Sequence, residues 1–431
     1  MRPQHLHRAR RERGAATLIV VMVLFLVMAL LAAYANRGLL FEQRIAGSYA
    51  RAALAQEVAE GGVEWALAQL NGPAIDASCQ PEAVGGQRFA DKYLQIGTAD
   101  RSMSLPQPWT KLFADCTRDS ANDGWSCRCP ALTTRVAPAA AGGTDLTPSF
   151  GIRIETPVTQ RNGTFSLMSV GCTDSVVDRC AGMDVGNRSQ YQFAVSTLHA
   201  MVALVGAVRT PPAEPLVVRG NLDMTGTGLG LHNTDPRSAG GLLAIGGVWT
   251  GMNDDRMQSV PGTALDQVRV QNDPTLGAAT SADEVFKMFM GATPSRYAQH
   301  PALRTVSCDG DCADALETAY KAGRRILWVD GPLSFGSNKT IGSITDPVLI
   351  IAKGDISLDG PFILNGMLVT TGNLSWNNAG GGTSLVNGMV LVGGSMQTSG
   401  AMDIAYQQAV ADQLSNRIGS FVRVPGGWID E

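Results

Sequence analysis

Charge and aromatic residues are scarce in this 431-residue sequence: charged residues make up 17%, aromatic residues 6%, and histidine occurs five times. The net charge of −4 gives no global reason to expect nucleic-acid binding. The motifs HExxH, GxSxG and the phosphate loop are missing. A hydrophobic share of 45% excludes a disordered chain, and 49 glycines indicate a turn-rich β protein. The length allows two or three domains.

Enzymatic activity has little support in the sequence, and we expect neither a catalytic site nor a cofactor. Repeated β structures can carry paired catalytic carboxylates. The candidates Asp355, Asp359 and Asp403 are scattered along the chain, so the sequence does not place any two of them together.

A run of 21 uncharged, mostly apolar residues, Ala15 to Ala35, follows a leader in which five arginines face one glutamate. As a helix at about 1.5 Å per residue it would span roughly 32 Å, close to a bilayer core of about 30 Å. The arginines predict a cytoplasmic amino terminus and an external body after Asn36. A secretory signal cut after Ala33-Tyr34-Ala35 is the weaker alternative, because the run is too long and the helical pattern continues through it.

The helical pattern continues as an amphipathic stretch. Apolar residues recur at three- and four-residue steps as far as Leu70, and Asn71-Gly72-Pro73 then predicts the end of the helix. One long helix over residues 15–72 therefore has a transmembrane half and an amphipathic half.

These features resemble a type IV prepilin, and two motifs resemble the PilX-type minor pilins in particular. They are Phe41-Glu42-Gln43-Arg44-Ile45-Ala46-Gly47 and Ala59-Glu60-Gly61-Gly62-Val63-Glu64. The resemblance implies that a prepilin peptidase cuts between Gly14 and Ala15 and that Ala15 becomes a methylated amino terminus. It also implies that this helix, including Glu42, Arg44, Glu60 and Glu64, packs with the helices of other subunits.

One position departs from the major pilins. Counted from Ala15, the fifth mature residue is Ile19, where most major pilins have a glutamate. A buried charge needs a partner, and in pilins that partner is thought to be a neighbouring subunit's terminal ammonium. Ile19 therefore favours a scarce subunit over a repeated shaft subunit.

The eight cysteines indicate an oxidising compartment. Cys79, Cys116, Cys127 and Cys129 lie in a stretch without clear periodicity, where we expect loops pinned by disulfides in any of three pairings. Zinc binding by these four is a weaker alternative. Cys172 and Cys180 are expected to pair, and calcium binding by Asp174 and Asp178 between them is the less favoured interpretation.

Three segments read as an antiparallel meander: Phe150 to Val158, Thr164 to Gly171 and Tyr191 to Leu204. Packed against the long helix, this sheet would complete a pilin-like α/β head over residues 73–210.

A three-residue motif recurs in the second half of the chain: a glycine, then any residue, then an apolar residue. The copies are Gly220-Asn221-Leu222, Gly246-Gly247-Val248, Gly354-Asp355-Ile356, Gly372-Asn373-Leu374 and Gly394-Ser395-Met396. Asn365-Gly366-Met367 and Asn387-Gly388-Met389 also repeat. Steps near 20 residues with strand patterning predict a β-solenoid-like domain over residues 211–431, with a sandwich as the alternative.

A helical insertion is expected at about residues 251–325. Ser281 to Glu284 forms a capping-box start, and Ala313 to Arg324 suits a second helix. Cys308 and Cys312 are expected to form a tight disulfide, with calcium binding by Asp309 and Asp311 as the alternative. A helix over Tyr406 to Arg417 could cover an open end of the solenoid, and Val424 to Trp428 resembles the terminal motif of large PilX-type proteins.

The predicted fold class is thus α+β, with residues 1–14 as the leader. The resemblance implies a minor pilin that primes or caps a type IV pilus, held in the inner membrane and later at the pilus tip. Its partners would be other minor pilins, the major pilin, the prepilin peptidase, the assembly platform and a PilY-type tip adhesin. A tip adhesin or DNA-binding pilin, using Lys321, Arg324, Arg325, Arg296 and Arg304, is the alternative, and a K-type pseudopilin of type II secretion is another.

Overall fold

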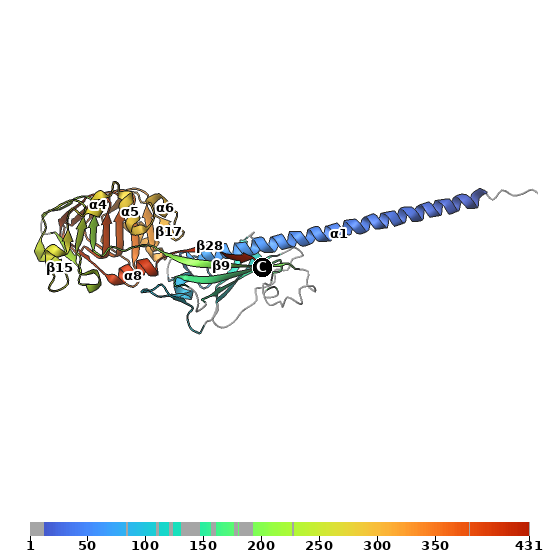
Figure 1. Cartoon of the computed structure of the whole chain (residues 1–431), viewed down its shortest axis with the longest axis horizontal. Coiled ribbons are helices and arrows are strands. Elements are labelled where there is room, and N and C mark those ends of the chain that lie inside the picture. The colour runs from blue at the N-terminus through green and yellow to red at the C-terminus, as the bar shows by residue number, and fades with distance from the viewer. Residues whose placement is uncertain are drawn as a thin grey trace, which may run out of the picture.

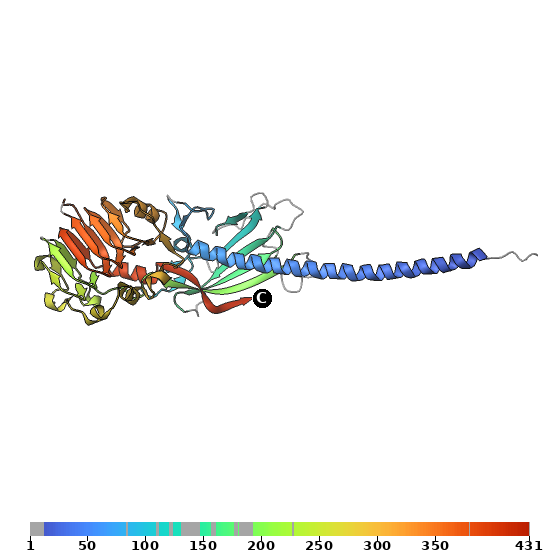
Figure 2. The ribbon, with the colours of Figure 1, turned by 90° about the horizontal axis from the view of Figure 1, so that it is seen from above.

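The computed structural model describes residues 13–82, 85–108, 112–119, 124–130, 147–156, 161–175, 180, 193–225, 228–378 and 380–430. The leader up to residue 12 and Asp178 lie outside this part. A single long helix projects from a body with two parts, which we call the head and the parallel-sheet part (Figure 1, Figure 2). The chain is a mixture of helix and sheet, as the sequence predicted.

The long helix α1 (Arg13–Leu70) forms from 58 residues without an internal proline. At about 1.5 Å per residue its length is roughly 87 Å. It ends where predicted: the backbone N–H of Asn71 still donates to the Leu67 carbonyl at 3.0 Å, and Pro73 has no N–H to continue the pattern.

The head contains a six-stranded antiparallel sheet in the order β28-β9-β8-β7-β5-β6. The strands are β5 (Leu112–Asp119), β6 (Gly124–Arg128), β7 (Ser149–Glu155), β8 (Thr164–Cys172), β9 (Val195–Gly206) and β28 (Gly419–Asp430). The three predicted strands correspond to β7, β8 and β9. The sequence missed β5 and β6, which form a hairpin in the stretch that we expected to be loops.

The outer half of α1 covers this sheet very closely. A Cβ on Gly171 of β8 would lie 2.1 Å from the Ala55 carbonyl oxygen of α1. The missing side chain at Gly171 therefore allows the close approach, and the helix shares one core with β7, β8 and β9 that includes Val63, Phe150 and Phe165. Short elements complete the head: β1 (Ala74–Ile75), β2 (Gln87–Arg88), α2 (Phe89–Tyr93), β3 (Gln95–Ile96) and β4 (Met103–Ser104).

The parallel-sheet part has a larger and a smaller sheet, both paired in parallel, with a shared apolar core between them. The larger sheet contains β10 (Leu216–Val218), β12 (Leu229–His232), β13 (Leu243–Ile245), β15 (Met257–Gln258), β16 (Arg269–Val270), β17 (Leu303–Thr305), β18 (Ile326–Val329), β20 (Lys339–Ile341), β21 (Val348–Ala352), β23 (Phe362–Thr370), β25 (Leu385–Val392) and β27 (Met402–Ala405). The smaller sheet, in the order β14-β11-β26-β24-β22-β19, contains β11 (Leu222–Thr225), β14 (Trp249–Thr250), β19 (Leu333–Phe335), β22 (Ile356–Asp359), β24 (Leu374–Asn378) and β26 (Met396–Gly400).

The sequence repeats lie in register across these sheets. Asn365-Gly366-Met367 of β23 pairs with Asn387-Gly388-Met389 of β25. Leu374 lies between Ile356 and Met396 on the smaller sheet. One copy was misaligned by a residue: Leu222 pairs with Trp249, and Val248 is 45% exposed.

Strand order departs from chain order, which the repeats did not reveal. β10, β11 and β12 pair with β25, β26 and β27, so the first strands of this part in sequence lie beside its last strands in the sheets. The chain then returns along the outer face of the larger sheet through α4 (Pro274–Ala278), α5 (Ala282–Met290) and α6 (Pro294–Tyr297) (Figure 1). The predicted insertion was too broad, because β15, β16 and β17 within residues 251–325 belong to the larger sheet.

Of the two later helices, α7 (Ala313–Lys321) lies within the predicted range Ala313 to Arg324, whereas α8 (Gln408–Asn416) differs in position from the prediction. α8 packs on the outer face of the larger sheet, beside β23 and β25, and not over an end. α7 instead inserts Leu316 into the core between the sheets, beside β20. Short 3-10 turns lie at η2 (Pro236–Ser238), η3 (Asp254–Arg256) and η4 (Leu265–Gln267).

The last strand, β28, returns to the head and pairs with β9. We expected residues 419–430 to belong to the repeated region. The parallel-sheet part is therefore inserted between two neighbouring strands of the head sheet.

Candidate functional site

The inner half of α1 has no packing partner within the described chain. Ala16–Ala35 is a 20-residue segment with a mean hydropathy of 3.0, and none of it is buried. Its length, roughly 30 Å, suits one membrane crossing. Gly14 and Ala15 lie in the first turn of α1, and Ile19 is 61% exposed.

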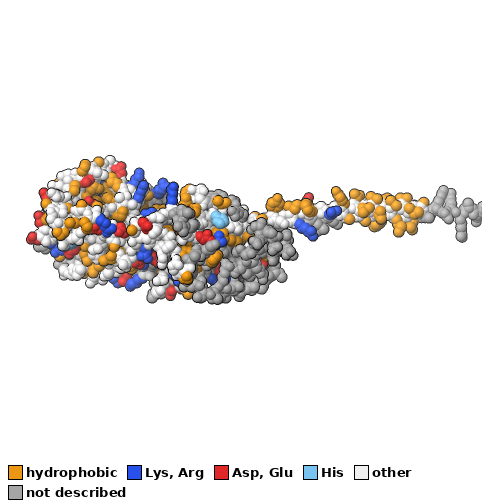
Figure 3. Space-filling model, turned by 60° about the horizontal axis from the view of Figure 1, so that its bottom comes forward, with side chains coloured by type: hydrophobic (Ala, Val, Ile, Leu, Met, Phe, Trp, Pro, Cys, Tyr) orange, Lys and Arg blue, Asp and Glu red, His pale blue; other side chains and the backbone are white. Residues whose placement is uncertain are grey.

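A second exposed segment of α1 links this span to the head. Phe41, Ile45 and Tyr49 are 66%, 41% and 74% exposed and recur every four residues, which places them on one face of the helix. Glu42 and Arg44 are exposed beside this stripe. Figure 3 shows orange hydrophobic side chains together with blue basic ones on the helix between the span and the head. The apolar stripe requires burial against other apolar surfaces.

The second motif of the helix is divided between the core and the solvent. Ala59 and Val63 are buried against the head sheet, whereas Glu60 and Glu64 are exposed. Glu64 forms an ion pair with Arg423 of β28, with an N to O distance of 2.6 Å. The motif thus packs the helix against the sheet through Ala59 and Val63 and pairs it with β28 through Glu64.

All eight cysteines are described, and all are in disulfides. The pairs are Cys79–Cys129, Cys116–Cys127, Cys172–Cys180 and Cys308–Cys312, with Cα to Cα distances of 5.2, 4.0, 5.9 and 5.1 Å. Cys116 and Cys127 are direct cross-strand partners on β5 and β6. The first four cysteines therefore join the end of α1 to this hairpin.

Asp311, next to Cys312, has hydrogen-bond partners within the protein. Asp311 accepts hydrogen bonds from the Ala313 backbone at 2.9 Å and from the Ser337 hydroxyl. Burial raises the pKa of Asp311, but these hydrogen bonds outweigh it and leave the pKa below its usual value. Within the described ranges, no three His, Cys, Asp or Glu side chains are grouped as metal ligands.

The three scattered aspartates do not meet. Asp359 ends β22 of the smaller sheet and Asp355 directly precedes that strand, while Asp403 lies on β27 of the larger sheet. Asp403 contacts His232 at 2.9 Å and Arg256 at 2.7 Å.

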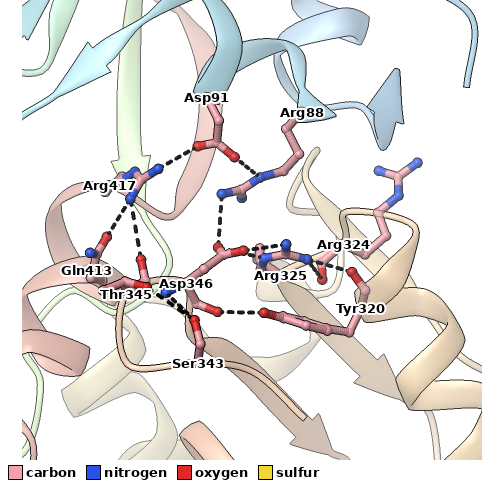
Figure 4. Close-up of polar contacts among 10 residues, drawn as sticks. All are labelled: Arg88, Asp91, Tyr320, Arg324, Arg325, Ser343, Thr345, Asp346, Gln413 and Arg417. Atoms are coloured by element: carbon pink, nitrogen blue, oxygen red, sulfur yellow. Dashed lines mark hydrogen bonds and ion pairs between the residues drawn. The ribbon is translucent and has the colours of Figure 1, made fainter. Parts of the chain in front are cut away.

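A polar network that sequence reasoning missed joins the head to the parallel-sheet part (Figure 4). Asp346 accepts from Arg325 at 2.5 Å and pairs with Arg88 of the head at 3.4 Å. Asp91 of the head pairs with Arg88 at 2.6 Å and with Arg417 at 3.1 Å. The partners are up to 326 residues apart, so no local pattern could have indicated them.

The surrounding arginines favour the ionised form of Asp346. Burial raises the pKa of the Asp346 carboxyl, but the Arg325 hydrogen bond and the charges of Arg88, Arg325 and Arg417 outweigh it and hold the pKa below its usual value. Asn71 strengthens the same region: its side chain donates to the Phe421 carbonyl at 2.9 Å and accepts from the Phe421 N–H at 2.8 Å.

Some of the basic candidates for DNA binding are engaged by other groups of the protein. Arg325 is bound to Asp346, and Lys321 pairs with Glu317 at 2.9 Å. Arg324 donates to the Asn71 carbonyl at 3.0 Å, and burial, together with Arg304, lowers its pKa. Arg296 and Arg304 are exposed. Of these residues, Arg324 and Arg325 lie at the junction between the two parts (Figure 4).

Comparisons with known proteins bear on the helix. No curated protein matches this chain. The solved structures that show similarity include an ice-binding protein from an Antarctic bacterium of the Flavobacteriaceae (12% identity, 48% of this chain and half of that one, TM-score 0.23). They also include the competence-associated pilin ComZ from Thermus thermophilus (10% identity, 89% of this chain and 98% of that one, TM-score 0.24). Both TM-scores are too low to indicate a shared overall fold. Residues 13–64 match the family described as PilX N-terminal. The exposed, apolar amino-terminal half of α1 therefore lies within the segment that is similar to the PilX N-terminal family.

Proposed function

We propose that this protein is a minor pilin that primes or caps a type IV pilus. The observation that carries the proposal is the contrast within α1: the helix is buried on the head from about Leu54 onward, yet its inner half is entirely exposed. A helix this apolar needs a bilayer before assembly and other helices afterwards. The PilX N-terminal match covers this segment.

In this proposal the leader is cytoplasmic, a prepilin peptidase cuts after Gly14, and Ala15 is methylated. The body then lies in the periplasm, where disulfides form, until the helix leaves the membrane and joins a bundle of pilin helices. The Phe41, Ile45 and Tyr49 face would be buried in that bundle. Other minor pilins and the major pilin are the expected neighbours.

The place of the parallel-sheet part supports a tip position. It lies at the end of the body opposite the free end of α1 (Figure 1, Figure 2). In a filament built from parallel helices, it would occupy the space above its own head and hinder another subunit there. We interpret residues 207–418 as a flattened β-solenoid, because the chain alternates between the two parallel sheets from β21 to β27.

Two experiments test the proposal. Mass spectrometry of the mature protein should find methylated Ala15, and a chain beginning at Asn36 would contradict it. Deleting the gene should abolish or strongly reduce surface pili while type II secretion continues. Loss of secretion with normal pili would favour a pseudopilin.

A further inference from the structure

Four strands of the smaller sheet present an unbroken polar surface to solvent. β22, β24, β26 and β11 alternate between buried residues, which are apolar except for Asn378 and Thr398, and outward polar residues. The residue just before each strand continues the outward set. We call these twelve residues the polar grid: Asp355, Ser357, Asp359, Asn373, Ser375, Asn377, Ser395, Gln397, Ser399, Asn221, Asp223 and Thr225.

The polar grid is a lattice because the strands are in register. Ser357 pairs with Ser375, Ser375 with Gln397, and Gln397 with Asp223. Neighbouring strands in a sheet lie about 4.8 Å apart, and every second residue along a strand is about 6.6 Å away. The middle row continues to Ser334 at one edge and Thr250 at the other.

Hydrogen bonds between strands hold the side chains of the grid in place. Along the first row, the Asn373 N–H donates to Asp355 at 2.7 Å, the Ser395 N–H to Asn373 at 2.9 Å, and the Asn221 N–H to Ser395 at 3.2 Å. In the third row, Ser399 donates to Asn377 at 2.8 Å. Side chains that are already ordered lose little entropy when they bind.

The composition of the polar grid restricts what it can bind. It has three carboxylates and no lysine or arginine, so it repels phosphate polymers. It has no aromatic or large apolar side chain, which a lipid surface or the core of a protein interface would require. Hydroxyl groups suit it, since they donate to carboxylates and accept from the amides of Asn373, Asn377 and Gln397.

We propose that the polar grid docks the filament on an ordered, uncharged polysaccharide surface. Its extended face offers no enclosing cleft for a single soluble sugar, whereas a repeating array of hydroxyls can meet many grid positions at once. The inference rests on the proposed function only in that a pilus would carry this face away from the cell.

Binding of the full-length protein in detergent micelles to microcrystalline cellulose and chitin particles tests the proposal. We expect saturable binding to at least one polymer. Ser375→Lys, which raises a long cation from the centre of the grid, should weaken it at least tenfold, and Gln397→Lys should repeat the effect from the next strand. Gln299→Lys is the matched control, because it makes the same charge change at an exposed position after α6.

Absence of binding to both polymers would overturn the proposal, as would equal binding by wild type, Ser375→Lys and Gln397→Lys at unchanged melting temperatures. Binding to ice crystals alone would overturn the polysaccharide assignment. Cells carrying Ser375→Lys should still form pili. The binding assay can therefore fail while the pilus proposal stands, and the gene deletion tests the pilus proposal separately.

Discussion

At the residue scale, single glycines decide whether α1 can lie on the head sheet. Gly171→Ala would place a methyl group 2.1 Å from the Ala55 carbonyl oxygen and 2.5 Å from the Ala59 nitrogen, both fixed backbone atoms. We expect a loss of about 1 to 3 kcal/mol in the free energy of unfolding. Denaturant unfolding of the micellar protein measures it.

Gly61→Ala is the matched control for that change. Nothing lies within 4 Å of a Cβ at Gly61, which faces away from the sheet. Replacing a helical glycine in open space should stabilise the protein by up to about 1 kcal/mol. Equal effects of the two substitutions would contradict the close packing described for β8.

His300 should make stability depend on pH. Its Nδ1 contacts the Ser420 hydroxyl of β28, its ring stacks on Tyr297, and burial lowers its pKa to about 4. The unfolded chain, with a histidine pKa near 6.5, binds the proton first as pH falls. Stability should therefore decline by about 2 to 3 kcal/mol between pH 7 and pH 4.5.

Thermal unfolding of wild type and His300→Phe over this pH range checks the expectation. The variant retains an aromatic ring against Tyr297 and lacks the titrating group, so its pH dependence should be shallower. Parallel pH profiles for the two proteins would show that His300 does not titrate between the folded and unfolded states.

At the element scale, β28 completes the head sheet although it follows the whole parallel-sheet part in the sequence. Phe421 packs beside Phe165 and pairs with Asn71 at the end of α1. A chain stopped after Ile418 loses this strand, and we expect a head that limited proteolysis cleaves readily. A chain stopped after Val424 keeps the pairs from Gly419 to Arg423 and loses only those from Trp428 to Asp430, so it should resist proteolysis much better than the shorter chain.

Local signals predicted the elements well where they were strong. The end of α1 followed from Asn71-Gly72-Pro73, and the start of α5 from Ser281, whose hydroxyl accepts from the Glu284 N–H at 3.4 Å. β5 and β6 were missed because their cysteines, glycine and charged residues lack an apolar alternation. β28 was missed because Pro425, Gly426 and Gly427 interrupt its strand pattern.

At the scale of the whole molecule, the sequence predicted the repeats but not their order. Parallel pairing of Leu216 with Val390 joins residues 174 positions apart, and neither residue carries a signal for the other. The ion pairs of Arg88 with Asp346 and of Arg417 with Asp91 also join residues that are far apart in the sequence and carry no signal for each other. Register and docking are thus decided by burial and charge complementarity in the folded chain.

The head should fold without the inserted part. Gly206 and Gly419 are paired on β9 and β28, so a two-residue Asn-Gly turn could replace residues 207–418. We expect this variant to show the circular dichroism of a folded α/β head and to retain the disulfides Cys79–Cys129 and Cys116–Cys127. An unfolded product would show that the junction network is required for folding of the head.

The double connection through β9 and β28 also sets how the protein carries mechanical load. β9 and β28 are hydrogen-bonded to each other, and both connect to the parallel-sheet part at the same end of the head. A force on the parallel-sheet part would therefore act on both strands in the same direction. Because both strands would be pulled in the same direction, the force would act parallel to β8 and β9. The hydrogen bonds between β8 and β9 would then have to break together, in shear. Tension at the far end of the molecule would thereby reach the long helix before either strand could peel away.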